Sequence, residues 1–387
     1  MDTLEELLGW ATSHGVKLNG ITPERIPGRG SGIIATRDIL ADEIVLDVPT
    51  PCLRTLSTVP KSRVRKLPSK ISVQGILAAD FVLDKSTKYT VWNAILPSLS
   101  DFSGMPLLWD PALQALLPFR SAKMLAKQHS KFNRDFEAFS TSFPDHVTRE
   151  GREQALKNFR YHWLLVNSRT FYYMDAALKR RPNLTTDDHL ALQPVADLFN
   201  HTDEGGCHVA YASDGYSFRA TVPFKKGDEV KICYGRHSND FLLIEYGFTM
   251  DENVWDEVVL DEVILSRFDE KGRERLEGVG FLGNYVLDRE QVCHRTQVAL
   301  RLLCCKVGEW RKFVDGTLDG EKTQKAVDAL LLEVLREYRV KAEGVLDEIR
   351  GLEVGEQDQR ELLVRRWEQI CRLLDSRIPS QELDNTS

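Results

Sequence analysis

The chain has little of what marks membrane, secreted or disulfide-stabilised proteins. None of its 387 residues lie in an apolar run of about 18 residues, the length that a membrane span requires. Its first residues, Met-Asp-Thr-Leu-Glu-Glu, are acidic and lead into no apolar signal core. We therefore expect a protein without a membrane segment, located in the cytosol, the nucleus or both.

Cysteine is also scarce, with seven residues and no C-x-x-C pair. An odd number of cysteines in a chain of this length argues against a disulfide framework and favours a reducing compartment. The candidate ligands His201, Cys207-His208 and Cys293-His294 match no common zinc spacing, so we predict no metal site.

The chain has no excess of positive charge. Its 58 Asp and Glu outnumber its 51 Lys and Arg, which gives a net charge of −7. Phosphate repels such a molecule, so nucleic acid is a poor candidate partner. A basic cluster from Lys61 to Lys70 is either a nuclear signal or anion-binding patch, or a solvated helix face, and the second reading is the commoner one. The chain length predicts two to three folding units with a large buried core.

The amino-terminal third combines a helix, strands and a long helical insertion. Apolar spacing predicts a helix over Leu4–His14, and β-branched runs predict paired strands at Ile33–Ala35 and Glu43–Pro49, opened by the glycine-rich loop Pro27–Gly32. Residues from about 57 to 160 lack strand alternation and predict a mainly helical insertion, whose last helix ends near Arg169.

A β-hairpin and then a helical region follow. Alternation at Val209 and Tyr211 and from Tyr216 to Val222, around Ser213-Asp214-Gly215, predicts the hairpin, and Glu229–Tyr234 predicts another strand. Single apolar stripes between Val327 and Ile349 and between Leu363 and Leu374 predict two core-facing helices. We expect a separate helical domain over residues 251–387, with a polar tail from Pro379.

Three short pieces concentrate polar and aromatic side chains. They are Asp197-Leu-Phe-Asn200-His201, Ile232-Cys-Tyr234-Gly and Glu245-Tyr246-Gly-Phe248. An amide and an imidazole supply donors and acceptors, a phenol supplies a hydrogen-bond partner, and aromatic rings attract cations. Together they predict a pocket for a small cofactor and a cationic side chain.

The order G-x-G, R-x-F, D-L-x-N-H, hairpin, Y-G and Y-G-F resembles the SET domain, in the branch of the plant Rubisco large-subunit lysine methyltransferase and its fungal and animal relatives. The resemblance implies an α+β fold of small sheets with a knot-like site, a SET domain over 1–250 that contains the insertion, and an all-helical substrate-binding-like domain over 251–387. It also implies S-adenosylmethionine as the cofactor and a protein as the substrate.

Site residues follow from the resemblance position by position. The catalytic residue is expected to be Tyr234, and the knot is expected to bring it to Asn200. Phe171 and Tyr246 are expected to line the substrate channel. Arg29 and Ser31 stand where relatives often carry an acidic and a bulky apolar residue, so backbone contacts are expected there. The expected cofactor contacts are Arg29, Gly30, Ser31, Arg169, Asp197, Asn200, His201, Tyr246 and Phe248.

Lysine is the expected methyl acceptor. A free lysine, with a pKa near 10.4, costs about 4 kcal/mol to deprotonate at about pH 7.4, and desolvation together with the cofactor's positive charge lowers that cost. In the histidine-methylating member of the branch an amide stands where Phe171 stands here, and an apolar ring suits a lysine channel. The expected substrate is a non-histone protein, such as a ribosomal, translation or metabolic protein, and the expected state is a monomer. Histone methylation and a catalytically silent SET fold that binds a protein are the alternatives.

Overall fold

The computed structural model describes residues 3–27, 30–175, 188–212 and 214–378. The chain divides into two compact units, and each combines separate stretches of sequence. The first comprises Met1–Ser103 and Ala126–Arg236, and the second comprises Gly104–Leu125 and His237–Ser387. The predicted domain boundary at residue 250 stays a prediction, whereas the compact units change at residue 237 and assign part of the insertion to the second unit.

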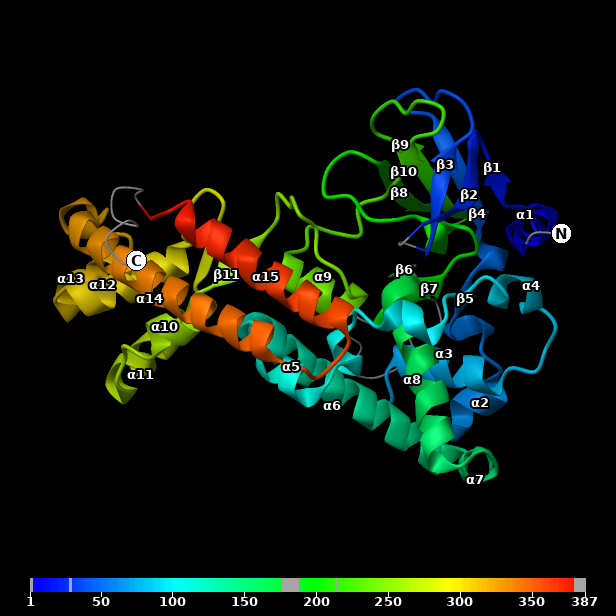
Figure 1. Cartoon of the computed structure of the whole chain (residues 1–387), viewed down its shortest axis with the longest axis horizontal. Coiled ribbons are helices and arrows are strands. Elements are labelled where there is room, and N and C mark those ends of the chain that lie inside the picture. The colour runs from blue at the N-terminus through cyan, green and yellow to red at the C-terminus, as the bar shows by residue number, and fades with distance from the viewer. Residues whose placement is uncertain (1–2, 28–29, 176–187, 213, 379–387) are drawn as a thin grey trace. The chain divides into compact units, whose positions relative to one another are not determined.

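Three small antiparallel sheets build the first unit (Figure 1). The first has the strand order β1-β4-β9-β8, the second β10-β3-β2 and the third β5-β7-β6. Their strands are β1 (Lys17–Leu18), β2 (Ile21–Ile26), β3 (Gly30–Ala35), β4 (Ile44–Pro49), β5 (Arg54–Thr55), β6 (Thr170–Tyr172), β7 (Leu190–Leu192), β8 (Cys207–Ala212), β9 (Gly215–Ala220) and β10 (Glu229–Val230).

The α-helices of the first unit precede β6 in the chain. The long α8 packs on α3, and its buried face carries Phe159, Trp163 and Leu164. It ends at Arg169, as predicted, and leads directly into β6. The helices of this unit are α1 (Thr3–Ser13), α2 (Lys61–Lys66), α3 (Val73–Leu83), α4 (Thr90–Asn93), α7 (Pro144–Glu150) and α8 (Arg152–Arg169), and α6 (Phe119–Ser142) has residues in both units.

Most of the strand predictions are confirmed, but one pairing is wrong. The hairpin forms between β8 and β9, with Ala212 opposite Gly215. The runs Ile33–Ala35 and Glu43–Pro49 do not pair with each other. Strand β3 pairs with β2 and β10, and β4 pairs with β1 and β9. The partner of β3 was missed because β2 contains Pro23 and two charged residues, which obscure a strand pattern.

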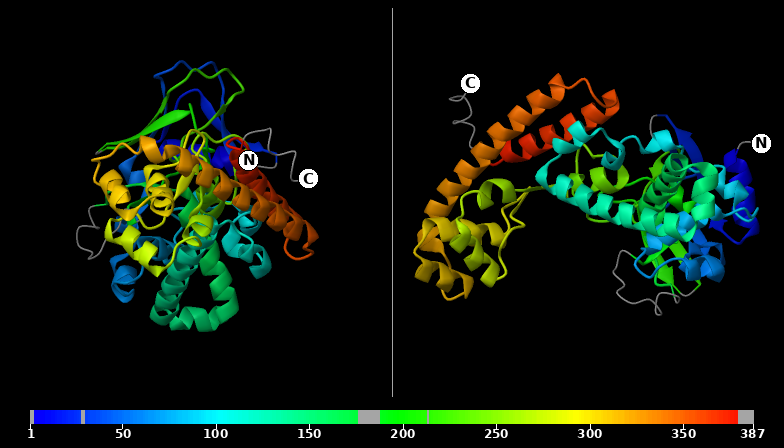
Figure 2. Two further views of the ribbon diagram at one scale, coloured as in Figure 1. Left: turned by 90° about the vertical axis from the view of Figure 1, so that its left-hand side faces the viewer. Right: turned by 90° about the horizontal axis from the view of Figure 1, so that it is seen from below.

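The second unit is mainly helical. Its helices are α5 (Pro111–Ala115), α9 (Asn239–Tyr246), α10 (Asp261–Leu265), α11 (Glu270–Gly278), α12 (His294–Cys304), α13 (Val307–Val314), α14 (Glu321–Gly351) and α15 (Gln357–Asp375), and a two-stranded sheet joins β11 (Glu257–Val259) to β12 (Val286–Asp288). Helices α14 and α15 lie side by side (Figure 2). All four predicted stripe residues of α15 are buried, namely Leu363, Trp367, Ile370 and Leu374. The predicted α+β class with a helical carboxyl-terminal part is confirmed, and β11 and β12 add a small sheet to it.

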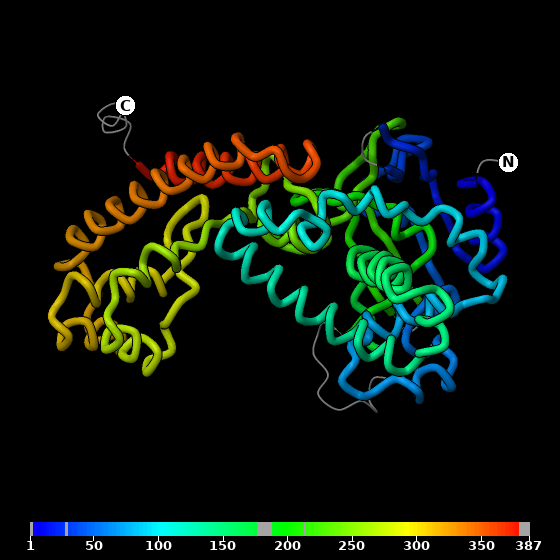
Figure 3. The backbone as a smooth tube through the Cα atoms, turned by 60° about the horizontal axis from the view of Figure 1, so that its bottom comes forward, coloured from blue at the N-terminus to red at the C-terminus, as the bar shows by residue number. Residues whose placement is uncertain are grey.

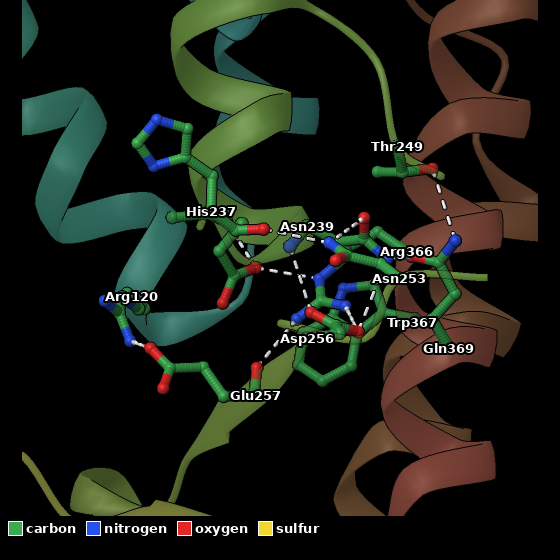
Figure 4. Close-up of polar contacts among 12 residues, drawn as sticks. Arg120, His237, Asn239, Thr249, Asn253, Asp256, Glu257, Arg366, Trp367 and Gln369 are labelled. Atoms are coloured by element: carbon green, nitrogen blue, oxygen red, sulfur yellow. Dashed lines mark hydrogen bonds and ion pairs between the residues drawn. The ribbon is translucent and has the colours of Figure 1, made fainter. Parts of the chain in front are cut away.

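A buried ion cluster joins α15 to the start of this unit's second segment (Figure 4). The Arg366 side chain has 0% exposure and donates from Nε to Asp240 and from Nη1 to Asp256, each at 2.8 Å. Burial by itself lowers the pKa of Arg366, but the two carboxylates outweigh it and raise that pKa above its usual value. Arg366 is therefore charged, and its buried charge is paired with the two carboxylates.

Residues 104–125 pack against the same helix (Figure 3). The indole nitrogen of Trp367 donates to the carbonyl of Leu116 at 2.8 Å, and Ser121 donates to Asp240 at 2.8 Å. Gly104 lies so close to Gly247 that a Cβ on it would stand 2.2 Å from the Gly247 carbonyl oxygen. This segment of the helical insertion is therefore part of the core of the second unit.

Candidate functional site

Two segments that are far apart in the sequence run parallel to each other in the first unit. His201 and Ile232 form a parallel bridge, in which the Ile232 N–H donates to the Asn200 carbonyl at 3.0 Å and the Thr202 N–H donates to the Ile232 carbonyl at 2.9 Å. These backbone bonds place Asn200 and His201 beside Tyr234. The structure therefore brings together the three residues that the family resemblance led us to expect at one place.

Tyr234 is tied to the other segment at both its backbone and its side chain. Its hydroxyl donates to the Phe199 carbonyl at 2.6 Å, and its amide N–H donates to Nδ1 of His201 at 3.1 Å. The two rings lie 5.0 Å apart between centroids. Because Nδ1 of His201 accepts a hydrogen bond, the neutral imidazole carries its proton on Nε2.

The environment of Tyr234 keeps its phenol protonated at neutral pH. Burial is the main cause that raises its pKa to about 12, and the negative charges of Asp197 and Glu229 act in the same direction against the opposing charge of Arg169. The phenol is thus a hydrogen-bonding group and not a proton acceptor near pH 7.

Asp197 and Arg169 meet at the end of α8. Arg169 donates from NH1 to the backbone carbonyl of Asp197, and Trp92 donates from its indole nitrogen to Oδ2 of Asp197 at 3.1 Å. Asp197 is 7% exposed, and burial raises its pKa to about 6 despite the nearby Arg169 charge and the bond from Trp92. Within the described residues its other oxygen, Oδ1, is buried without a hydrogen-bond partner. A buried carboxyl oxygen in that condition suits a ligand donor.

Asn200 is oriented by two acceptors. Its side-chain nitrogen donates to Oε1 of Glu229 at 2.7 Å and to the Ser31 carbonyl at 3.3 Å. Gly30 and Ser31 of the glycine-rich loop open β3, and the Ser31 carbonyl reaches Asn200. The predicted backbone contacts of this loop with a cofactor stay a prediction. The predicted contact Arg29 lies outside the described residues.

The predicted channel residue Phe171 lies in β6 within a cluster of aromatic rings. Its ring centroid is 5.9 Å from that of Phe218 and 6.2 Å from that of Tyr216. Phe218 in turn stacks on Phe199 at 5.2 Å, and the Phe199 carbonyl accepts the hydroxyl of Tyr234. Phe171 is therefore linked through two rings to the backbone that holds the phenol.

The remaining predicted residues, Tyr246 and Phe248, belong to the second unit. They flank Gly247, which ends α9 in a left-handed conformation with φ of 79°, and their rings lie 6.3 Å apart. A Cβ on Gly247 would lie 2.8 Å from Met105, so the corner depends on glycine. Their predicted contact with a cofactor held by the first unit stays a prediction.

Sequence reasoning missed several neighbours of these residues. Glu229 bonds Asn200, Trp92 bonds Asp197, and Val195 has φ of 69° just before the Asp197 turn. A β-branched residue with positive φ costs roughly 1–3 kcal/mol, which the surrounding contacts must offset. A strand pattern does not reveal which acidic residue faces Asn200, and a lone tryptophan in a helical insertion reads as core, so the sequence held no clear signal for either.

In the part of the chain that the structure describes, no three His, Cys, Asp or Glu side chains are grouped so as to hold a metal ion. None of the helices there combines the length and the apolar character needed to cross a membrane.

Comparison with known proteins adds two family models. Residues 30–235 match the model of the SET domain, and residues 256–380 match the model of the ribosomal lysine N-methyltransferase 2 C-terminal domain. The first model covers more than half of the chain and contains every described site residue of the first unit.

Individual relatives and a solved structure agree with these models. The chain is 27% identical over 369 residues to ribosomal lysine N-methyltransferase set11 of Schizosaccharomyces pombe, covering 91% of each chain. It is 25% identical over 276 residues to human actin-histidine N-methyltransferase, covering 66% of this chain and 44% of that one. The structure of Rubisco LSMT bound to AdoMet superposes with a TM-score of 0.61 at 17% identity, covering 100% of this chain and 94% of that chain, which shows a shared fold.

Proposed function

Because the chain belongs to the SET-domain family, we propose that it is an S-adenosylmethionine-dependent protein-lysine N-methyltransferase that acts on a non-histone protein. One observation carries the proposal. Tyr234 is bonded to His201 through its backbone and to the Phe199 carbonyl through its hydroxyl, and the Ile232 N–H donates to the Asn200 carbonyl, so the phenol and the imidazole lie together beside the backbone of Asn200.

The residues at this place suit a zwitterionic cofactor. Arg169 supplies a cation, Asp197 supplies a buried oxygen without a partner among the described residues, and Asn200 supplies an amide oxygen. We propose that these three groups, with His201 and the backbone of Gly30 and Ser31, hold S-adenosylmethionine. When bound, that cofactor provides a methyl group already activated for transfer by the positive charge of its sulfonium.

The protein then has to align a neutral amine with that methyl group. We propose that Phe171 lines the acceptor channel, where an apolar ring favours the uncharged lysine. Tyr234 orients the amine through its hydroxyl, because a pKa of about 12 leaves the phenol protonated at neutral pH. The lysine proton leaves to solvent before transfer, so no side chain acts as a strong base.

The substrate is proposed from relatives. A relative that covers 91% of the chain is named a ribosomal lysine N-methyltransferase, and the helical part matches the model of a domain from another enzyme of that name. We propose a ribosomal protein, or another translation or metabolic protein, as the substrate, methylated in the cytosol or nucleus by a monomer. Human actin-histidine N-methyltransferase is also similar, so the acceptor residue needs a direct test.

The test is methyl transfer from isotope-labelled S-adenosylmethionine to proteins of a lysate from cells that lack this protein, followed by mass spectrometry of the labelled peptides. The proposal expects label on lysine with the wild type and strongly reduced label with Tyr234→Phe. Label on histidine alone would reverse the acceptor assignment. Cofactor binding without transfer to any protein would instead favour a silent binding module.

A further inference from the structure

The two hydrogen-bond partners of Asn200 fix which way its side-chain amide points. Its nitrogen lies 2.7 Å from Oε1 of Glu229 and 3.3 Å from the Ser31 carbonyl, and both of these atoms only accept hydrogen bonds. Turning the amide over would place its oxygen against two other oxygens. The two N–H groups are thereby used within the protein.

A ligand can therefore form a hydrogen bond only with the oxygen of this amide, Oδ1. Within the described residues no hydrogen bond is made to Oδ1 of Asn200. An oxygen in that position recognises a hydrogen-bond donor and rejects a carboxylate. The Glu229 carboxylate, which is 13% exposed, polarises the amide and makes its oxygen more negative, which favours a cationic donor over a neutral one.

Gly32 leaves the space that this arrangement needs. A Cβ built on Gly32 would stand 3.0 Å from the Asn200 nitrogen, 3.0 Å from Oε1 of Glu229 and 2.3 Å from Cδ1 of Ile26. The other oxygen of Glu229 lies 3.5 Å from the Lys231 ammonium, which restrains the carboxylate from its far side. The hydrogen bond between Asn200 and Glu229 is thus enclosed by strands β3 and β10.

We propose that Glu229 is a positioning residue, which holds the Asn200 amide so that its oxygen receives the α-ammonium group of the cofactor. This inference rests on the proposed function, since it assigns a role within the same cofactor site. Gly32 serves the same role indirectly, because it makes room for the bond.

The experiment compares two ligands that differ at the group in question. S-adenosylhomocysteine carries an α-ammonium group, whereas 5′-methylthioadenosine has the same nucleoside without any amino-acid portion. Calorimetry with Glu229→Ala should show about tenfold or greater loss of affinity for the first, as expected when one charge-assisted bond no longer fixes a contact, and little change for the second. Glu229→Gln should retain most of the affinity, because its side-chain oxygen still accepts from Asn200.

Two controls separate positioning from general loss of structure. Glu43 likewise holds a polar side chain, that of Arg37, in the loop between β3 and β4 of the first unit, and Glu43→Ala should leave both affinities unchanged. In an Asn200→Ala background, Glu229→Ala should cause no further loss of affinity for S-adenosylhomocysteine.

Each outcome decides a different question. If the wild type binds neither ligand, the proposed function fails. If the wild type binds S-adenosylhomocysteine, the proposed function stands, and three results would still overturn the positioning role. Glu229→Ala could leave the affinities unchanged, could lower the affinity for both ligands equally, or could lower the affinity for S-adenosylhomocysteine just as much in the Asn200→Ala background.

Discussion

Replacing Tyr234 with phenylalanine is the most direct perturbation of the proposed reaction. The change removes one oxygen atom and keeps the ring beside His201. It also leaves the Phe199 carbonyl without the hydroxyl that donates to it at 2.6 Å, which should lower the free energy of unfolding by about 1–2 kcal/mol.

The expected effect on the rate follows from the pKa of the phenol. With a pKa of about 12, ionising Tyr234 at pH 7.5 costs about 6 kcal/mol, so the phenolate makes no useful contribution as a base. The hydroxyl acts as a preorganised hydrogen-bonding group, and loss of one such group lowers kcat by roughly 100- to 1,000-fold. Cofactor affinity should stay within about threefold, because Asn200, Arg169 and Asp197 are unchanged.

The assay is methyl transfer at saturating cofactor between pH 7 and 10.5, with calorimetry of S-adenosylhomocysteine. Both proteins should show rates that rise with pH as the substrate lysine deprotonates and that level off below the free-lysine pKa of about 10.4, because desolvation and the cofactor's positive charge lower the pKa of the bound lysine. Tyr161→Phe is the matched control, because Tyr161 also donates to a backbone carbonyl, that of Pro97, at 2.7 Å. It should lose similar stability and keep its rate.

Two results would refute this reasoning. A wild-type rate in Tyr234→Phe would remove the phenol from the mechanism. A wild-type rate that keeps climbing up to pH 10.5, with a variant whose rate levels off below that pH, would show that the phenolate is the base after all.

Three further predictions concern the cofactor, the pH dependence and the helical unit. Asn200→Ala should weaken S-adenosylhomocysteine binding about tenfold in calorimetry, and equal affinity would argue against the site. Burial raises the pKa of Asp197 to about 6, so folding disfavours its ionised form relative to the unfolded chain. The free energy of unfolding should therefore fall as pH rises through about 6. Asp197→Asn should therefore stabilise the ligand-free protein by up to about 3 kcal/mol at pH 8 and by little at pH 4, and an equal gain in thermal melts at both values would contradict the assignment. Arg366→Met should cost about 3–5 kcal/mol in urea unfolding, because Asp240 and Asp256 stay buried without their cation, whereas the partly exposed pair of Arg339 with Asp375 should cost at most about 1 kcal/mol when Arg339 is changed to Met.

Local patterns were sufficient to predict several elements. The alternation around Asp214-Gly215 identified the hairpin, and the stripe from Leu363 to Leu374 identified the buried face of α15. In both cases neighbours in the sequence are also neighbours in the element, so periodicity carries the information.

Contacts between distant segments were out of reach of those patterns. Nothing local indicates that Glu229 faces Asn200, because that contact depends on how strands are ordered in a sheet. The pairing of β3 with its neighbour β2 is local, but Pro23 and two charged residues hid the strand pattern of β2. The convergence of Asn200 with Tyr234 was expected only through the family resemblance. The predicted strand at Glu229–Tyr234 is shorter than expected because its second half runs beside Asn200–Thr202 and not in a regular ladder.

The discontinuous second unit has a consequence for synthesis on the ribosome. Leu116 emerges 251 residues before Trp367, whose indole is its partner, and translation at about 5–20 residues per second separates them by roughly 10–50 seconds. Asp240 and Asp256 are also synthesised before Arg366, their ion-pair partner. A nascent chain that stops before α15 would expose two acidic groups and an incomplete apolar face, which makes it a target for chaperones and proteases. Shortened versions lacking the last helix should accordingly accumulate poorly in cells even though they retain every residue of the SET match.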